Sequence, residues 1–241
     1  VLQLLPELKF GGVERGTVDL SEHLTKLGHQ SAVVSAGGGL TEQLSNHGAK
    51  HFSLPIAKKN FLAIKQYKNL QEIYREFKPD IIHVRSRFPA WINVLALKGL
   101  PFSKPIVIST FHGLYSKPFY SKSMSYANDI IAISKTVQKY VLKNYDVDHS
   151  RVHLIYRGCY IDEFNTSTPS EAWSNSWFKE FPQTSDKILL TLPGRITGWK
   201  GIEDFLILLS QLDQTKYHSL IPGPVNENKK RYFQSLLVLV K

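Results

Sequence analysis

At about 150 residues per domain, a chain of 241 residues is long enough for one complete domain and part of a second. Hydrophobic residues make up 42% and charged residues 21%, which excludes disordered, collagen-like and low-complexity proteins. Lys+Arg (30) exceed Asp+Glu (20), and the net charge of +10 favours anionic partners such as nucleic acid, an anionic membrane surface or phosphorylated small molecules. The single cysteine, Cys159, excludes an internal disulfide and is typical of a reducing compartment.

The sequence has no segment that is typical of membrane insertion or export. No apolar run approaches the ~20 residues of a membrane-spanning helix. Residues 1–8 lack the basic region and the apolar length of a signal peptide, so we expect a cytoplasmic protein. Because the chain begins with Val1 inside an apolar run, we also expect either that preceding residues are missing or that the start codon is unusual.

Apolar runs alternate with stretches of helical periodicity, which predicts an α/β protein with a parallel sheet. The strands of the first part are expected at residues 1–5, 30–35, 51–55, 81–84, 105–110, 129–133 and 152–155. The helices are expected at residues 13–27, 41–46, 60–77, 91–98 and 134–144.

The pattern changes after this part. Residues 165–186 are rich in Thr, Ser, Pro and Trp without a clear period, which predicts a linker with one helical turn. Strands at 188–192 and 217–221 and helices at 201–212 and 227–240 then follow. We therefore expect an N-terminal domain at 1–164 and the start of a second α/β domain at 187–241, incomplete because two strands leave a sheet face uncovered.

The first candidate site is a glycine loop between the first strand and its helix. Gly11 and Gly12 place backbone amides and the positive end of the helix dipole where a phosphate can bind. The ATPase pattern fails because Thr17 follows Gly16 directly, where a lysine is required, and the dinucleotide pattern fails because Val13 replaces its second glycine. The alternative is a tight turn that lets the helix approach the sheet.

A second glycine loop, at residues 194–201, also joins a strand to a helix. Arg195 offers a planar guanidinium and Lys200 a point charge, and both can point at one pyrophosphate. The alternative is that both are solvated loop cations.

His112 follows the strand at 105–110, and ligands of parallel sheets gather at the carboxyl ends of strands. A structural role is the alternative for this histidine. Arg85 and Arg87 follow the strand at 81–84 on the same edge, where they meet an anionic group or remain ordinary surface cations.

Two further features have simpler structural interpretations. Asp146 and Asp148 form a D-x-D sequence on the opposite edge of the sheet, where we expect a turn, and no metal site is predicted. The helix at 60–77 begins with basic residues that suit an anionic membrane surface, although most amphipathic helices cover their own core. These residues are Lys58, Lys59, Lys65 and Lys68.

Five short motifs occur in one order along the chain. They are GGVE at 11–14, STFHG at 109–113, IIAIS at 130–134, VHLIYRG at 152–158, and PGR at 193–195 with WKG at 199–201. This arrangement resembles family-4 glycosyltransferases, and most of all the bacterial enzymes that build lipopolysaccharide or capsular polysaccharide. No nucleic-acid-binding motif is present.

The resemblance implies a GT-B fold, in which two Rossmann-like domains bind the acceptor (N-terminal) and the nucleotide-sugar (C-terminal), without a metal or another cofactor. It implies that the loop of Gly11 and Gly12 approaches the donor diphosphate and that Arg195 and Lys200 neutralise it as it leaves. His112 would lie beside the transferred sugar. The implied enzyme is a retaining hexosyltransferase for a saccharide or lipid-linked acceptor, peripheral at the inner face of the membrane.

The chain also departs from the family. The donor domain of the family normally continues further and carries a glutamate pair, E-x7-E, which Glu203 and Glu227 do not supply. We therefore expect a fragment or a truncated gene product. A sugar-nucleotide epimerase and a non-catalytic binding domain remain alternatives, and the aromatic, basic loop at 113–125, with Lys117 and Lys122, is a candidate for acceptor binding.

Overall fold

The computed structural model of the chain describes residues 1–57, 60–100, 105–115, 118–162, 164 and 167–240. They form two compact units, Val1–Cys159 and Tyr160–Lys241, and each is described here by itself. In the described part of the chain, no helix combines the length and the apolar composition needed to cross a membrane.

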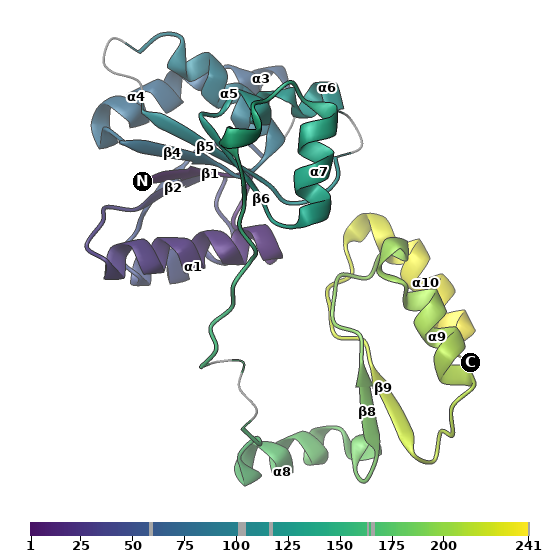
Figure 1. Cartoon of the computed structure of the whole chain (residues 1–241). Helices are drawn as coiled ribbons and strands as arrows, with labels where there is room; N and C mark the ends of the chain where they lie inside the picture. Colours follow the sequence, from purple (N-terminus) through teal and green to yellow (C-terminus); the bar gives the residue numbers. More distant parts are fainter. Residues whose placement is uncertain (58–59, 101–104, 116–117, 163, 165–166, 241) are drawn as a thin grey trace. The chain divides into compact units, whose positions relative to one another are not determined.

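The first unit is built on a seven-stranded parallel sheet (Figure 1). Its strands are β1 (Leu2–Leu4), β2 (Ala32–Ser35), β3 (Lys50–Ser53), β4 (Ile81–Val84), β5 (Ile106–Phe111), β6 (Asp129–Ala132) and β7 (Val152–Leu154). Their order in the sheet is β3-β2-β1-β4-β5-β6-β7, and neighbouring strands pair in parallel throughout. This is the doubly wound arrangement of a Rossmann-like domain, so the predicted α/β fold class is confirmed.

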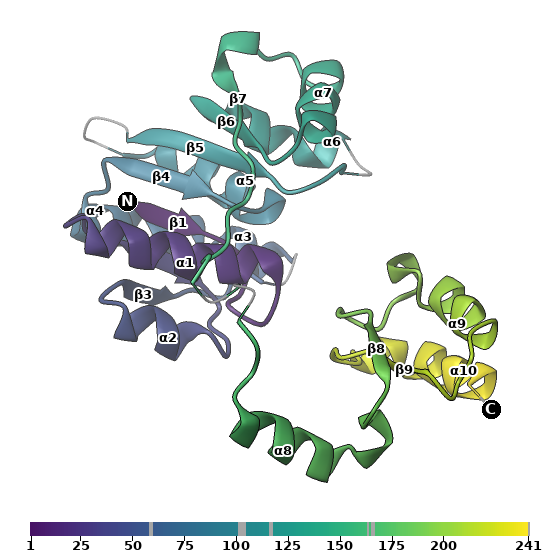
Figure 2. The same ribbon diagram turned by 60° about the horizontal axis from the view of Figure 1, so that its bottom comes forward.

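Helices cover both faces of the sheet (Figures 1 and 2). They are α1 (Gly12–Lys26), α2 (Thr41–Asn46), α3 (Phe61–Ile64), α4 (Tyr67–Phe77), α5 (Arg87–Leu97), α6 (Pro118–Ser121), the 3₁₀ helix η1 (Lys122–Tyr126) and α7 (Lys135–Asn144). Val18 of α1 and Leu44 of α2 share a buried cluster with Val33 of β2, whereas α4, α5 and α7 pack into a larger cluster on the other face. Sheets buried on both faces have apolar strands, as the sequence predicted.

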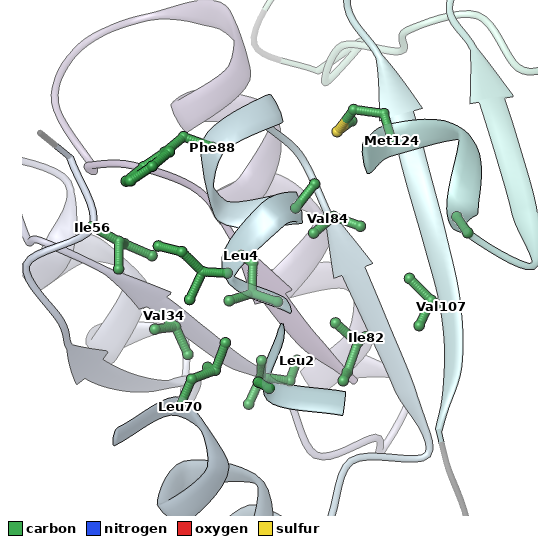
Figure 3. Close-up of a cluster of buried hydrophobic side chains, with 14 of the residues drawn as sticks. Leu2, Leu4, Val34, Ile56, Leu70, Ile82, Val84, Phe88, Val107 and Met124 are labelled. Atoms are coloured by element: carbon green, nitrogen blue, oxygen red, sulfur yellow. The ribbon is translucent and has the colours of Figure 1, made fainter. Parts of the chain in front are cut away.

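Figure 3 shows the larger cluster around the central strands. Leu2 and Leu4 of β1 are fully buried on one face because alternate residues of a strand point the same way. Leu70 of α4 and Phe88 of α5 pack into the same cluster. Burial of these side chains holds the strand ends, and hence the loops that follow them, in place.

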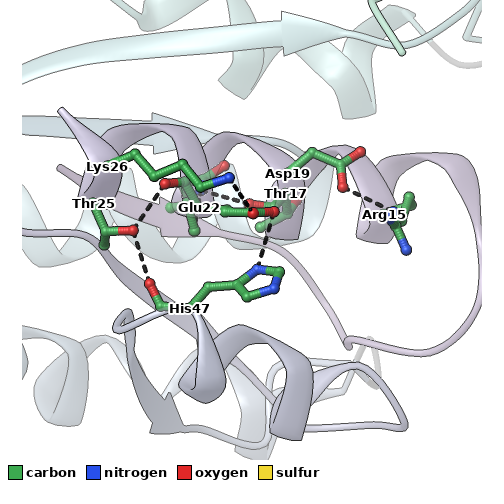
Figure 4. Close-up of polar contacts among 9 residues, drawn as sticks. Arg15, Thr17, Asp19, Glu22, Thr25, Lys26 and His47 are labelled. Carbon is green, nitrogen blue, oxygen red and sulfur yellow. Dashed lines mark hydrogen bonds and ion pairs between the residues drawn. The ribbon is translucent and has the colours of Figure 1, made fainter. Parts of the chain in front are cut away.

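Polar contacts on the outer face of α1 hold this helix against the end of α2 (Figure 4). Glu22 pairs with Lys26 one turn later, at 2.7 Å, and with the ring of His47, at 3.2 Å. The Thr25 hydroxyl donates a hydrogen bond to the carbonyl oxygen of His47 at 2.8 Å. The position of α1 matters because its first turn follows the glycine loop.

The structure corrects two predicted helices of the first unit. In place of the expected helix at 60–77 the structure has two helices, α3 and α4. They are separated by a turn in which the backbone amide of Gln66 donates a hydrogen bond to the carbonyl oxygen of Ala63. Helix α5 begins at Arg87, four residues before the predicted start at Trp91, because Ser86 takes an extended conformation and Pro89 fits the first turn.

The second unit contains a two-stranded parallel sheet. Its elements are α8 (Glu171–Glu180), β8 (Ile188–Thr191), α9 (Ile202–Ser210), β9 (Tyr217–Leu220) and α10 (Lys230–Leu239). A small cluster of Ile196, Ile202 and Leu236 forms its buried core. The prediction of a linker at 165–186 was wrong in one respect. In place of one helical turn, this segment contains the ten-residue helix α8, whose first turn is capped by Ser170.

Candidate functional site

The connections after β1 and β4 define the centre of the candidate site in the first unit. These adjacent strands lead to α1 and α5, which pack against opposite faces of the sheet. Such a switch point opens a crevice at the carboxyl ends of the strands, where ligands of doubly wound sheets bind. Gly12 follows β1 here as the first residue of α1, and Arg85 follows β4.

Arg85 is buried at this switch point, with 7% of its surface exposed, so its interpretation as an ordinary surface cation was wrong. Its Nη1 donates to Oε1 of Gln3 at 3.1 Å. Gln3 in turn donates from Nε2 to the carbonyl oxygen of Thr17 and to the hydroxyl of Ser21 on α1, at 3.0 and 2.8 Å. Gln3 is a polar side chain in the apolar run of β1, but this local pattern does not show which residues it contacts.

Arg85 remains charged at neutral pH in spite of its burial. Desolvation, and then repulsion by Arg157, lower its pKa to about 10, against the opposing effect of the Asp19 and Glu14 carboxylates. Its Nε has no hydrogen-bond partner among the described residues. A buried cation with an unused donor is costly in isolation, which favours an anionic ligand nearby.

His112 lies directly after β5, at the carboxyl ends of the strands. Its backbone amide donates to the hydroxyl of Tyr115 at 3.4 Å, and its Nδ1 lies 3.0 Å from Nη2 of Arg157. Burial, followed by repulsion from Arg85 and Arg157, lowers the pKa of His112 to about 3. The imidazole is therefore neutral at physiological pH, which suits hydrogen bonding rather than proton donation from an imidazolium.

Arg157 is a residue of this site for which sequence reasoning assigned no role. It follows β7, and its Nη1 donates to the carbonyl oxygen of Gly12 at 2.6 Å. It belongs to the motif at 152–158, but nothing in the local pattern connects it to Gly12 or to His112, which are 145 and 45 residues away.

Arg87 lies at the start of α5 and contacts two aromatic rings. Its guanidinium carbon is 4.7 Å from the ring centroid of Tyr115 and 5.2 Å from that of Tyr120. These distances are typical of cation–π contacts, so Arg87 orders the aromatic loop after His112. In that loop Lys122 is exposed, whereas Lys117 lies outside the described residues, as do Lys58 and Lys59.

The D-x-D sequence lies at the opposite edge of the sheet, as predicted. Asp148 accepts a hydrogen bond from the amide of Ser150 at 2.8 Å and caps the short 3₁₀ helix before β7, so the predicted turn is confirmed. Asp146, with Phe119 and Arg151, lines a hollow of about 560 Å³ at this edge. Within the described ranges, no group of three His, Cys, Asp or Glu residues gathers as metal ligands would.

In the second unit, Arg195 and Lys200 lie in the loop between β8 and α9. Arg195 is exposed, and the stem of Lys200 lies over Gly194, where an added Cβ would be 3.4 Å from Cε of the lysine. The Lys200 ammonium is 4.6 Å from the ring centroid of the exposed Trp199. Gly201, with φ of 69°, caps α9, so both cations precede a helix N-terminus.

The structure thus places Gly11, Gly12 and His112 at one edge of the first unit, and Arg195 and Lys200 in one loop of the second. The first group also includes Arg85, which is hydrogen-bonded to Gln3 of β1, and Arg157, which links the segment after β7 to Gly12 after β1 and to His112 after β5.

Residues 10–163 match the family model Glycosyltransferase Family 4, which confirms the family predicted from the motifs. The uncharacterized glycosyltransferase MJ1607 of Methanocaldococcus jannaschii is 25% identical over 211 residues, which cover 80% of this chain and 54% of that protein. The chain therefore spans about half the length of this curated relative.

Two solved structures show the extent of the structural likeness. The crystal structure of a glycosyltransferase from Rickettsia africae ESF-5 has a TM-score of 0.81 and 30% identity, and the match covers 99% of this chain and 62% of that one. Anabaena Alr3699/HepE, in complex with UDP and glucose, has a TM-score of 0.82 and 16% identity, covering 99% and 65%. At 16% identity, the second likeness shows the GT-B-type fold alone.

Proposed function

Because the chain belongs to glycosyltransferase family 4, we propose that it takes part in the transfer of a hexose from a nucleotide-sugar to a saccharide or lipid-linked acceptor of the cell envelope, with retention of configuration. UDP-glucose is the donor proposed for the first test, since HepE, which shares the fold, is described in complex with UDP and glucose. Lipopolysaccharide or capsular polysaccharide is the proposed product, by the resemblance of the five motifs.

The observation that carries this proposal is the charge of the switch point. Arg85 and Arg157 are cations, and burial together with their repulsion holds His112 neutral. Cations in fixed positions stabilise the charge that develops on a departing diphosphate. The choice of a transferase over an epimerase rests on the family match of residues 10–163.

Each predicted site residue has a proposed role. The loop of Gly11 and Gly12 approaches the diphosphate, and Arg195 and Lys200 neutralise it. His112 donates a hydrogen bond to the transferred sugar or to the acceptor hydroxyl, and a pKa of about 3 argues against its acting as a general acid. The acceptor oxygen bonds to the anomeric carbon as the bond from that carbon to the diphosphate breaks, and an oxygen of the departing phosphate takes the proton of the acceptor hydroxyl.

Peripheral membrane binding at the cytoplasmic face is proposed for a lipid-linked acceptor. Its support is the net charge of +10 and two exposed lysines, Lys65 between α3 and α4 and Lys68 in the first turn of α4.

The proposal is tested by thermal unfolding and calorimetric titration of this chain with UDP, UDP-glucose, GDP and GDP-sugars. A nucleotide that binds the native state raises the melting temperature by mass action. Loss of a hydrogen bond to a charged group costs about 1.5–3 kcal/mol, so Lys200→Ala should weaken UDP binding ~10- to 100-fold.

Lys216→Ala is the matched control, since Lys216 is an exposed lysine of the same unit that pairs with Asp213 at 3.7 Å. This variant should bind UDP as the unaltered chain does. If none of the nucleotides changes the melting temperature, this chain lacks a working donor site and acts as a binding domain only.

A further inference from the structure

Arg157 connects three loops at the carboxyl edge of the first unit. Its guanidinium donates from Nη1 to the carbonyl oxygen of Gly12, at 2.6 Å, and from Nη2 to Nδ1 of His112, at 3.0 Å. We propose that Arg157 is a positioning residue that fixes His112 as the Nε2–H tautomer and ties this imidazole to the first turn of α1. This inference deepens the proposed function and rests on it for the identity of the ligand that His112 meets.

The direction of the hydrogen bond determines the tautomer of His112. A guanidinium carries only N–H donors, so Nδ1 of the imidazole accepts and its single proton is on Nε2. An imidazolium would turn an Nδ1–H group toward the guanidinium, so Arg157 also opposes protonation of the ring. Burial and the positive charges of Arg85 and Arg157 act in the same direction on the pKa of His112.

The Nε2–H group is then an unused donor. In the part of the chain that the structure describes, Nε2 of His112 is out of contact with solvent and has no hydrogen-bond partner. The phenol of Tyr115 contacts the backbone of His112 instead, and the neighbouring His83 bonds to the hydroxyl of Thr110 at 2.7 Å. Because an unsatisfied buried donor is costly, Nε2–H suits an oxygen of a ligand, such as a sugar hydroxyl.

The absence of a side chain at Gly12 makes room for the guanidinium. A Cβ at this position would lie 2.8 Å from Nη1 of Arg157, closer than the two atoms can approach without a shift. In this chain Gly12 therefore does more than form a tight turn. A substitution at Gly12 should displace Arg157 and release His112, which provides a second way to perturb the same contact.

A lysine cannot replace Arg157 fully. The two acceptors are held by two separate nitrogens of one planar group, whereas an ammonium is a single point charge. Arg157→Lys should keep the positive charge beside His112 but lose the simultaneous contact with Gly12. Arg157→Gln removes the charge as well, and its amide can donate to or accept from Nδ1.

The test is NMR of the full chain with ¹⁵N-labelled histidine, without any ligand, with the His112 signals assigned by their loss in His112→Gln. We expect the Nε2–H tautomer in the unaltered chain and no protonation of His112 down to about pH 4. In Arg157→Gln and in Gly12→Ala, the two tautomers should mix and the titration midpoint should rise, but it should stay below 6.5, the ordinary value of histidine, because burial and Arg85 still lower the pKa. Arg157→Lys should give a smaller rise.

Arg75→Gln is the control, because Arg75 is an arginine of α4 that pairs with Glu72 at 2.5 Å, outside the site. It should leave His112 unchanged. An Nδ1–H tautomer in the unaltered chain would overturn the proposal. It would also be overturned if the His112 signals and titration midpoint of Arg157→Gln and of Gly12→Ala equalled those of the unaltered chain; if one of the two variants does not fold, the other decides.

Addition of UDP-glucose separates this inference from the proposed function. A shift of the Nε2 signal on addition supports a ligand at His112. The His112 signals can instead show the predicted tautomer but fail to respond to UDP-glucose, GDP-sugars or their nucleotides. That result would support the role of Arg157 in orienting His112 and would contradict the proposed donor.

Discussion

The two units of the chain hold their functional residues in different ways. In the first unit, Arg85 and His112 follow strands of a seven-stranded sheet; Arg85 is hydrogen-bonded to Gln3 of strand β1, and His112 to Arg157, which follows β7. In the second unit, the exposed Arg195 and the partly exposed Lys200 lie in a glycine loop beside a two-stranded sheet. Side-chain contacts position the residues of the first unit, whereas backbone conformation positions those of the second. Three predictions test this difference.

The largest effect is expected from the core of the first unit. Leu4 is fully buried in the central strand β1, so Leu4→Ala should lower the free energy of unfolding by about 2–5 kcal/mol. Leu208→Ala, on the exposed side of α9 in the second unit, should change it by less than about 0.5 kcal/mol. Urea denaturation measures both. Equal losses would show that the second unit depends on apolar packing as much as the first.

The next effect tests the backbone of the second unit. A Cβ at Gly223 would overlap the carbonyl oxygen of Gly194. The backbone amide of Gly194 donates a hydrogen bond to the carbonyl oxygen of Pro222 at 2.9 Å. Overpacking of this kind costs about 1–3 kcal/mol, and Gly223→Ala should also weaken nucleotide binding because it displaces the loop of Lys200. Hydrogen exchange of residues 188–220 measures the loss of stability, and titration with UDP measures the loss of nucleotide affinity.

Gly198→Ala is the control for this change, since a Cβ there would be 3.9 Å from the ring of Tyr232, at ordinary contact distance. Unaltered hydrogen exchange in Gly223→Ala would contradict the view that close backbone packing determines this loop.

The smallest effect on stability is expected from changes at two serine caps, one at the start of α7 and one at the start of α8. Ser134 accepts a hydrogen bond from the Val137 amide at the start of α7, and Ser170 does so from the Trp173 amide at the start of α8. Each Ser→Ala change costs about 1 kcal/mol of helix stability. Because α7 buries Val137 and Val141 while α8 buries no residue, Ser134→Ala should lower the global unfolding free energy.

Ser170→Ala should instead show only as faster hydrogen exchange in α8, with the global unfolding free energy unchanged. A global loss of about 1 kcal/mol in this variant as well would mean that α8 is cooperative with the rest of its unit.

The elements that the sequence predicted well are those with local signals. The strand predicted at 81–84 coincides with β4 (Ile81–Val84), and Ser134 caps α7 as predicted. The predicted single helix at 60–77 failed because its apolar periodicity continues across the turn at Lys65 and Gln66. Helix α8 was missed although Trp173, Trp177 and Phe181 recur every fourth residue and their rings contact one another, because the surrounding Ser, Thr and Pro residues were interpreted as a linker.

The residues of the candidate site also differ in whether local signals predicted them. His112 and the loop of Gly11 and Gly12 could be predicted, because position at the end of a strand is a local property of an α/β sequence. The burial of Arg85 could not, since it depends on Gln3 and α1, which the fold brings to β4 from the beginning of the chain.

The alternation of strands and helices, the family and the residues at the strand ends follow from the sequence, because periodicity and short motifs involve neighbours along the chain. The contacts of Arg157 with both Gly12 and His112, and hence the nitrogen of His112 that carries the proton, follow from the fold. The physical reason is that such contacts join residues as far as 145 positions apart, and their geometry exists only once β1, β5 and β7 are aligned in one sheet.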